Sequence, residues 1–167
     1  MRSLDACIAL AQETPMIVLA FVIGIVAGLR AMMAPAAIAW AATHGSLSLQ
    51  GTWLAFLGWR FSPWILTILA LGELVTDQLP STPSRKVPVQ FGARLLTGGV
   101  SGAAVGYGVG SPLAGLVLGL VGAVIGTLGG AAVRARLAAS FGSDRPAALI
   151  EDAIAILGAV FVAAALW

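Results

Sequence analysis

Long apolar runs alternate with short polar stretches along this chain, and the alternation predicts membrane-spanning helices. One span needs roughly 20 apolar residues, and five runs come near that length. They cover residues 16–42, 63–79, 90–109, 113–133 and 146–166. The pattern therefore predicts an all-α fold: a polytopic membrane helix bundle of about five transmembrane helices, formed as a single domain over residues 1–167.

Two residues interrupt the first apolar run. Arg30 lies near its centre, and Pro35 lacks the backbone donor that a continuous helix needs. We therefore expect a first span that is broken at Pro35. Residues 3–13, ahead of this run, are expected to form a separate short helix at the membrane interface.

Residues 51–60 are apolar and aromatic but too short to span a bilayer. They include Trp53, Trp59 and Arg60, residues typical of the membrane–water interface. This segment is expected to be a short helix that is either interfacial or re-entrant, and the sequence leaves both alternatives open.

The composition agrees with a membrane protein. Hydrophobic residues make up 59% of the chain and charged residues only 10%, whereas soluble domains contain about 25% charged residues. The net charge of +2 is too small to indicate a nucleic-acid partner. Because Cys7 and His44 are the sole cysteine and histidine, we expect no disulfide within the chain, no metal site and no cofactor. The first helix is expected to be retained rather than cleaved as a signal peptide.

The basic residues predict an orientation. Five spans place the N-terminus and the loops 80–88 and 134–145 on one side of the membrane. That side has six basic residues: Arg2, Arg85, Lys86, Arg134, Arg136 and Arg145. The opposite side has Arg60. Because cytoplasmic loops are enriched in Lys and Arg, the N-terminus is expected in the cytoplasm and the C-terminus outside.

Glycines recur every four residues in the third and fourth runs, in the manner of a glycine zipper. The glycines concerned are Gly98, Gly102, Gly106, Gly122, Gly126 and Gly130. This spacing keeps them on one helical face, where backbones can approach closely. We expect the third span to pack on the fourth within one chain, with a homodimer interface or a narrow pathway as the alternatives.

Several ionisable residues fall inside or at the edge of the predicted spans, where they are costly and often functional. They are Arg30, Glu73, Asp77, Arg94, Glu151 and Asp152. Glu73 and Asp77 share a helical face, and Arg94 could reach them. Glu151 and Asp152 point about 100° apart, so one of them is expected to face the bundle. The set predicts either an ion-pair network that fixes helix register or a substrate or ion site in the cytoplasmic half.

A proline-rich loop between the second and third runs has a second candidate site. Its hydroxyls and cations belong to Ser81, Thr82, Ser84, Arg85 and Lys86. Such a loop can bind a phosphate or a lipid headgroup. The alternative interpretation is a rigid turn whose charges set the topology.

Three motifs resemble a known family. They are GLRAMMAPAA at 28–37, the stretch from Glu73 through DQLPSTPSR at 77–85, and ALIEDAIAI at 148–156. Together they are similar to the small bacterial membrane proteins catalogued as domain of unknown function 4126. The resemblance implies a bacterial inner-membrane protein, multi-pass, and it transfers no catalytic residues.

The leading functional hypothesis is transport or permeation of an ion or small solute. It rests on a proline-broken span with a central arginine, beside paired acids. The lipid bilayer is the expected partner, together with a homodimer or larger homo-oligomer. The alternative is a non-transporting membrane component that binds a lipid or a partner. An enzyme is disfavoured because the chain lacks a histidine acid–base pair, a nucleophile elbow and a P-loop.

Overall fold

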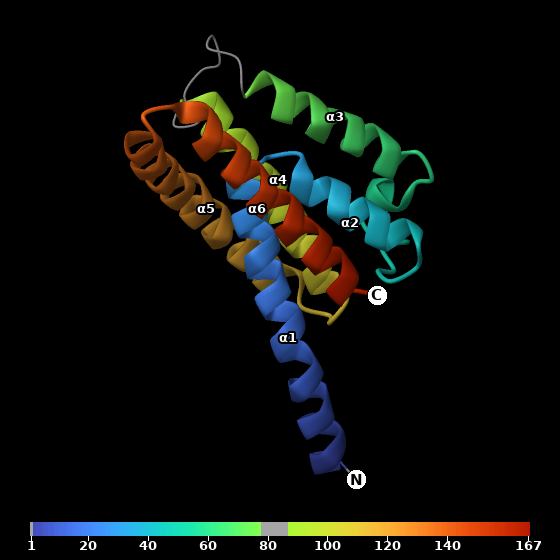
Figure 1. Ribbon diagram of the computed structural model, residues 1–167. Helices are drawn as coiled ribbons and strands as arrows, with labels where there is room; N and C mark the ends of the chain where they lie inside the picture. Colours follow the sequence, from blue (N-terminus) through green and yellow to red (C-terminus); the bar gives the residue numbers. More distant parts are fainter. Residues whose placement is uncertain (1, 78–86) are drawn as a thin grey trace.

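The computed structural model describes residues 2–77 and 87–167, with side chains from residue 15 onward. This part of the chain is all-α, with six α-helices, one 3-10 helix and no strand. The helices are α1 (Arg2–Leu29), α2 (Met33–Thr43), η1 (Ala55–Gly58), α3 (Ser62–Thr76), α4 (Pro88–Tyr107), α5 (Pro112–Phe141) and α6 (Asp144–Ala165). Figure 1 shows them packed side by side, with α3 on the outer side of the bundle next to α2.

Prolines and a glycine mark the helix ends. Pro88 and Pro112 open α4 and α5, where their missing N–H groups would have no helical partner. Gly142 ends α5 in the left-handed conformation, with φ of 64°, which glycine adopts without steric cost. These residues fix the length of α5 at 30 residues.

α5 packs against α4 through glycines on both helices. A Cβ atom added to Gly102 would collide with the Gly115 carbonyl, and one added to Gly106 would lie 2.6 Å from the Ser111 carbonyl oxygen. Gly119 in turn meets the backbone of Gly98. Such close approach brings many backbone atoms into van der Waals contact, so α4 and α5 form one of the most extensive helix pairs in the fold.

The later glycines of α5 lie against a different helix. Cβ atoms at Gly122 and Gly126 would collide with the carbonyls of Phe21 and Ile25 on α1. Gly130 is half-buried and lines a small cavity between α1, α5 and α6. The expectation that one glycine face joins the third and fourth spans is therefore incomplete, because α5 lies between α1 and α4 and uses glycines toward both.

The α3 helix is the most peripheral element of the described part. It packs mainly on α2 and η1, without extensive contact to α1, α4, α5 or α6. One hydrogen bond between α2 and α3 runs from Trp40 Nε1 to Thr67 Oγ1, at 3.1 Å. Bulky apolar side chains such as Ile68 and Val75 are exposed on its outer face. α3 is therefore attached along one side only.

Two helices of the described part, α5 and α6, are long and apolar enough to cross a membrane. Only 28% of the apolar stretch of α5 and 39% of that of α6 is buried inside the protein. A core helix of a soluble protein would be mostly buried, whereas apolar surface of this extent needs an apolar environment.

The expected number of five spans is not reached. The runs predicted at 16–42 and 63–79 form helices shorter than a simple span, since α2 has 11 residues and α3 has 15. The described apolar part of α1, Pro15–Leu29, is also short. α4 has 20 residues, which is long enough for a span. Gln90, Arg94 and its many glycines lower its mean hydropathy, so α4 is not one of the two helices that are both long and apolar enough to cross a membrane.

The first apolar run is broken, but not at the predicted place. The chain leaves the helix at residues 30–32, and Pro35 lies inside the first turn of α2, where a missing N–H costs nothing. Residues 3–13 are not a separate helix, because α1 continues through Pro15.

A predicted loop at 134–145 and a predicted short helix at 51–60 also differ from the structure. Arg134 and Arg136 lie on α5 rather than in a loop, because the helix extends to Phe141. Within the segment at 51–60, only Ala55–Gly58 is helical, as the single 3-10 turn η1. Ser62 ties this turn to the start of α3 through a bond of 2.5 Å to the Phe56 carbonyl.

Candidate functional site

The break in the first apolar run creates two helix ends inside the bundle. α1 ends at Leu29 and α2 begins at Met33. The last carbonyls of a helix and the first amides of the next have no partner within their own helix. The carbonyl end has partial negative charge and the amide end partial positive charge. Each end therefore needs a polar partner of opposite sign.

Arg94 on α4 satisfies the carbonyl end. Its Nη1 atom donates to the carbonyls of Gly28 at 2.7 Å and Leu29 at 2.5 Å. The side chain is 1% exposed, and its charge has the sign that a helix C-terminus favours. Thr127 on α5 adds a hydroxyl donor to the Gly28 carbonyl at 3.2 Å. The end of α1 is thus fixed by α4 and α5 together.

Glu73 on α3 satisfies the amide end. Its Oε1 and Oε2 atoms accept hydrogen bonds from the backbone amides of Ala31 and Met32, both at 2.8 Å. The same carboxylate lies 3.7 Å from Arg94 Nη2. Two charge-assisted bonds from neighbouring amides hold both of its oxygens. One carboxylate from the peripheral helix therefore occupies the start of α2.

Arg30 lies in the break itself and joins three segments. Its side chain is fully buried. Nε donates to Asp152 Oδ1 on α6 at 2.7 Å, and Nη2 contacts the same oxygen. Nη1 forms an ion pair with Asp77 at the end of α3. Because removing one partner of a buried ion pair leaves the other uncompensated, these contacts fix α3 and α6 relative to the break.

Five of the six ionisable residues chosen from the sequence therefore meet at one place. They are Arg30, Glu73, Asp77, Arg94 and Asp152, which we call the break cluster. Among the described residues, two guanidinium groups face three carboxylates. Arg30 and Arg94 are buried completely or almost so, whereas the side chains of Glu73 and Asp77 are each 14% exposed. The cluster is more accessible on its α3 side.

Glu151 belongs to a different group. It lies 3.4 Å from Arg134 Nη1, and Arg134 also makes two bonds to the Asp144 carboxylate, at 2.9 and 2.6 Å. Glu151 and Asp152 are both buried, so the expectation that only one of them faces the bundle is wrong. They face different partners because adjacent helical residues point about 100° apart.

The sequence gives little indication of the backbone part of the site. The amides of Ala31 and Met32 and the carbonyls of Gly28 and Leu29 become available only because the helix ends at residue 29. Pro35 and Arg30 indicate that the helix is broken, but they do not show at which residue the first helix ends and the second begins. Arg134 was interpreted as a topology signal, whereas the structure makes it the partner of Glu151.

The proposed phosphate or headgroup loop lies outside the described residues. This applies to Ser81, Thr82, Ser84, Arg85 and Lys86. Among the side chains that the structure describes, at 15–77 and 87–167, no group of three or more His, Cys, Asp or Glu residues is arranged to hold a metal ion.

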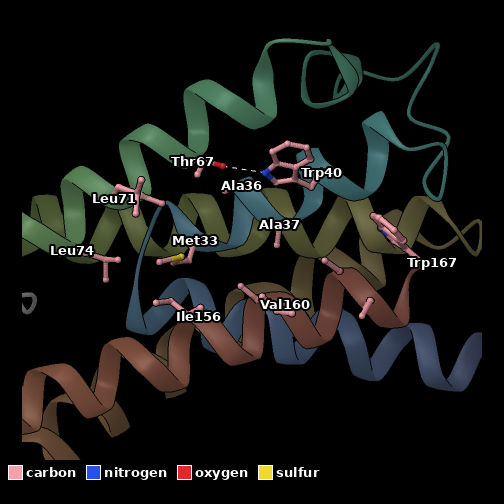
Figure 2. Close-up of a pocket in the computed structure, with 14 residues that line it drawn as sticks. Met33, Ala36, Ala37, Trp40, Thr67, Leu71, Leu74, Ile156, Val160 and Trp167 are labelled. Carbon is pink, nitrogen blue, oxygen red and sulfur yellow. Dashed lines mark hydrogen bonds between the residues drawn. The ribbon is translucent and has the colours of Figure 1, made fainter.

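An apolar groove of about 500 Å³ lies beside the break cluster. α2, α3 and α6 line it, and Figure 2 shows Met33, Leu74 and Ile156 at one end and Trp40 and Trp167 at the other. Met33 and Leu74 directly follow Met32 and Glu73 in the sequence, so that end of the groove adjoins the cluster. None of the lining residues that the structure describes is charged.

Comparisons with known proteins give no match to a protein-family model, to a curated protein or to a solved structure. The resemblance to the family catalogued as domain of unknown function 4126 therefore stays a prediction from its three motifs.

Proposed function

We propose that this chain is a multi-pass protein of a bacterial inner membrane that conducts or transports an ion or a small solute. In this proposal the N-terminus is cytoplasmic and the C-terminus is outside, as the basic residues predict. The permeation site is the break cluster. The exposed apolar faces of α5 and α6 contact lipid.

The broken helix is the observation on which the proposal rests. Many transporters build their sites from discontinuous helices, whose ends offer partial charges to a substrate within the membrane. Here both helix ends are turned toward charged side chains from other helices, Arg94 and Glu73. Each helix end thus has a charged partner from a helix other than its own, within reach of a permeating substrate.

Reconstitution in liposomes tests the proposal. Purified wild-type protein is expected to move ions or small solutes faster than empty liposomes do. Arg30→Lys keeps the charge but loses the planar fork that reaches Asp77 and Asp152 together, so we expect reduced flux. Arg60→Lys, at an exposed arginine beside Phe61, is the matched control and keeps wild-type flux. If folded wild-type protein moves none of the salts and solutes tested, the proposal is wrong.

A second candidate function is lipid binding without transport. The groove of about 500 Å³ supports it, since this volume lies within the usual range of small-molecule pockets. Ala163→Phe would place a ring in the groove, whereas Ala165→Phe lies on the same helix outside its lining. If the groove binds lipid, mass spectrometry will find lipid copurified with wild type and Ala165→Phe, and less with Ala163→Phe. Equal lipid in all three would contradict this function.

A further inference from the structure

We infer that the permeant is a small anion, and that the carboxylates of α3 occupy its site in the structure described. This inference rests on the proposed function and names its substrate class. Glu73 is the central residue, because its carboxylate accepts hydrogen bonds from the backbone amides of Ala31 and Met32, just before α2.

The donors around this carboxylate are all N–H groups. The amides of Ala31 and Met32 bind its two oxygens, and Arg94 Nη2 lies 3.7 Å from Oε1. Arg30 lies next to these amides in the chain, and its guanidinium binds Asp77. Two almost fully buried guanidinium groups beside two amides that have no partner within their own helix form a donor set that suits an oxyanion or a halide.

The charge of the cluster depends on α3. With α3 in place, two arginines face three carboxylates among the described residues. Withdrawal of Glu73 and Asp77 removes two negative charges from the cluster and leaves Asp152 as its carboxylate among the described residues. The cluster becomes more positive by two charges, which favours the binding of an anion.

α3 is the helix best placed to move. It packs mainly on α2 and η1, and the apolar groove separates it from α6. Its two carboxylates and the bond from Trp40 to Thr67 are its polar attachments to the bundle among those described. Figure 2 shows that Leu74, next to Glu73, already lies at the edge of the groove.

The carboxylates of α3 and a free anion compete for the same donors. The charged groups that face Glu73 and Asp77 are Arg30 from the break and Arg94 from α4, with Asp152 of α6 sharing Arg30. An anion that binds these arginines and the amides just before α2 therefore takes the place of the carboxylates when α3 withdraws.

Nitrate flux into liposomes tests the inference. Glu73→Gln removes the charge and one of the two acceptor oxygens, and we expect roughly tenfold higher nitrate flux at neutral pH, the change that about 1.4 kcal/mol produces. Nitrate should also raise the melting temperature of Glu73→Gln in detergent more than that of wild type, while gluconate, a larger anion, should not. Asp144→Asn removes an exposed carboxylate near the start of α6 and is the control, with wild-type nitrate flux.

The wild type gives an independent measurement if Glu73→Gln does not fold. Its nitrate flux should exceed its potassium flux, because the donors of the site are N–H groups that bind an anion. If wild-type protein moves potassium or a neutral solute but not nitrate, the anion inference is wrong and the proposed function stands. If it moves nothing, the proposed function itself fails. Nitrate flux that is the same in Glu73→Gln and wild type would also overturn the inference.

Discussion

The side of this protein built from α1, α4 and α5 differs from the side built from α2 and α3 in what holds it together. α1 and α4 each meet α5 backbone to backbone through glycines, so these contacts with α5 are short, numerous and uncharged. α3 is attached along one side, through Glu73, Asp77 and the bond from Trp40 to Thr67. Glycine contacts cannot be exchanged without separating the helices, whereas a carboxylate can be replaced on its donors by a competing anion. We therefore expect α1, α4 and α5 to keep a fixed arrangement and α3 to move relative to them.

The largest expected effect comes from the residue that joins the two sides. Arg30→Ala leaves Asp77 and Asp152 without their shared guanidinium partner. Losing one partner of a buried ion pair costs about 3–5 kcal/mol, so we expect little folded protein by size-exclusion chromatography in detergent. Arg60→Ala is the control, because Arg60 is exposed. A folded Arg30→Ala protein with wild-type thermal stability would show that the break does not need its charges.

Glycine substitutions measure the rigid side. Gly102→Leu must separate α4 from α5, since even a Cβ atom would collide with Gly115 and lie 2.8 Å from the Cα of Gly119. Overpacking of this kind typically costs about 1–3 kcal/mol, and more where backbone is in the way. We expect a lower melting temperature, and the same for Gly126→Leu against α1.

Gly129→Leu is the matched control for both variants. No atom outside the neighbouring backbone of its own helix lies within 4 Å of a Cβ added there, so the new side chain meets open space. Its melting temperature should equal or exceed that of wild type, because leucine favours a helix more than glycine does. Equal destabilisation at positions 102 and 129 would show that the loss comes from helix propensity and not from packing.

The smallest expected effect concerns the attachment of α3. Trp40→Phe keeps most of the ring but loses the bond to Thr67, worth about 0.5–1.5 kcal/mol. Hydrogen exchange followed by mass spectrometry should show faster exchange in α3, with α4 and α5 unchanged. If exchange rises equally in all three helices, α3 is not an independent element and the two sides form one cooperative unit.

Much of the fold can be predicted from local patterns. Glycine spacing identifies the close faces of α4 and α5, and prolines mark the starts of three helices. The number of crossing helices cannot be predicted in this way, because hydropathy does not show where a helix ends. Pro35 is the instructive case: it was expected to break a helix, but it lies in the first turn of α2, where its effect is favourable.

The sequence predicts which side chains belong to the candidate site, but not which of them contact one another. Buried charges are rare enough that Arg30, Glu73, Asp77, Arg94 and Asp152 could be selected by type and position alone. Which of Glu151 and Asp152 pairs with Arg30 depends on the rotation of α6, which one sequence does not determine. The backbone groups of residues 28–32 depend on where the break falls, and tertiary contacts decide that.

The pairing of Arg30 with Asp152 also has a consequence for biosynthesis. The two residues are 122 positions apart in the chain, and Asp152 belongs to α6, which is made after α1 to α5. At about 5–20 residues per second, the ribosome needs on the order of ten seconds to reach Asp152 after Arg30. During that interval the nascent protein has Arg30 in its first apolar segment without this counterion. The bundle that the structure describes is therefore completed only when α6 packs, and a chain that stops before α6 would leave Arg30 without Asp152.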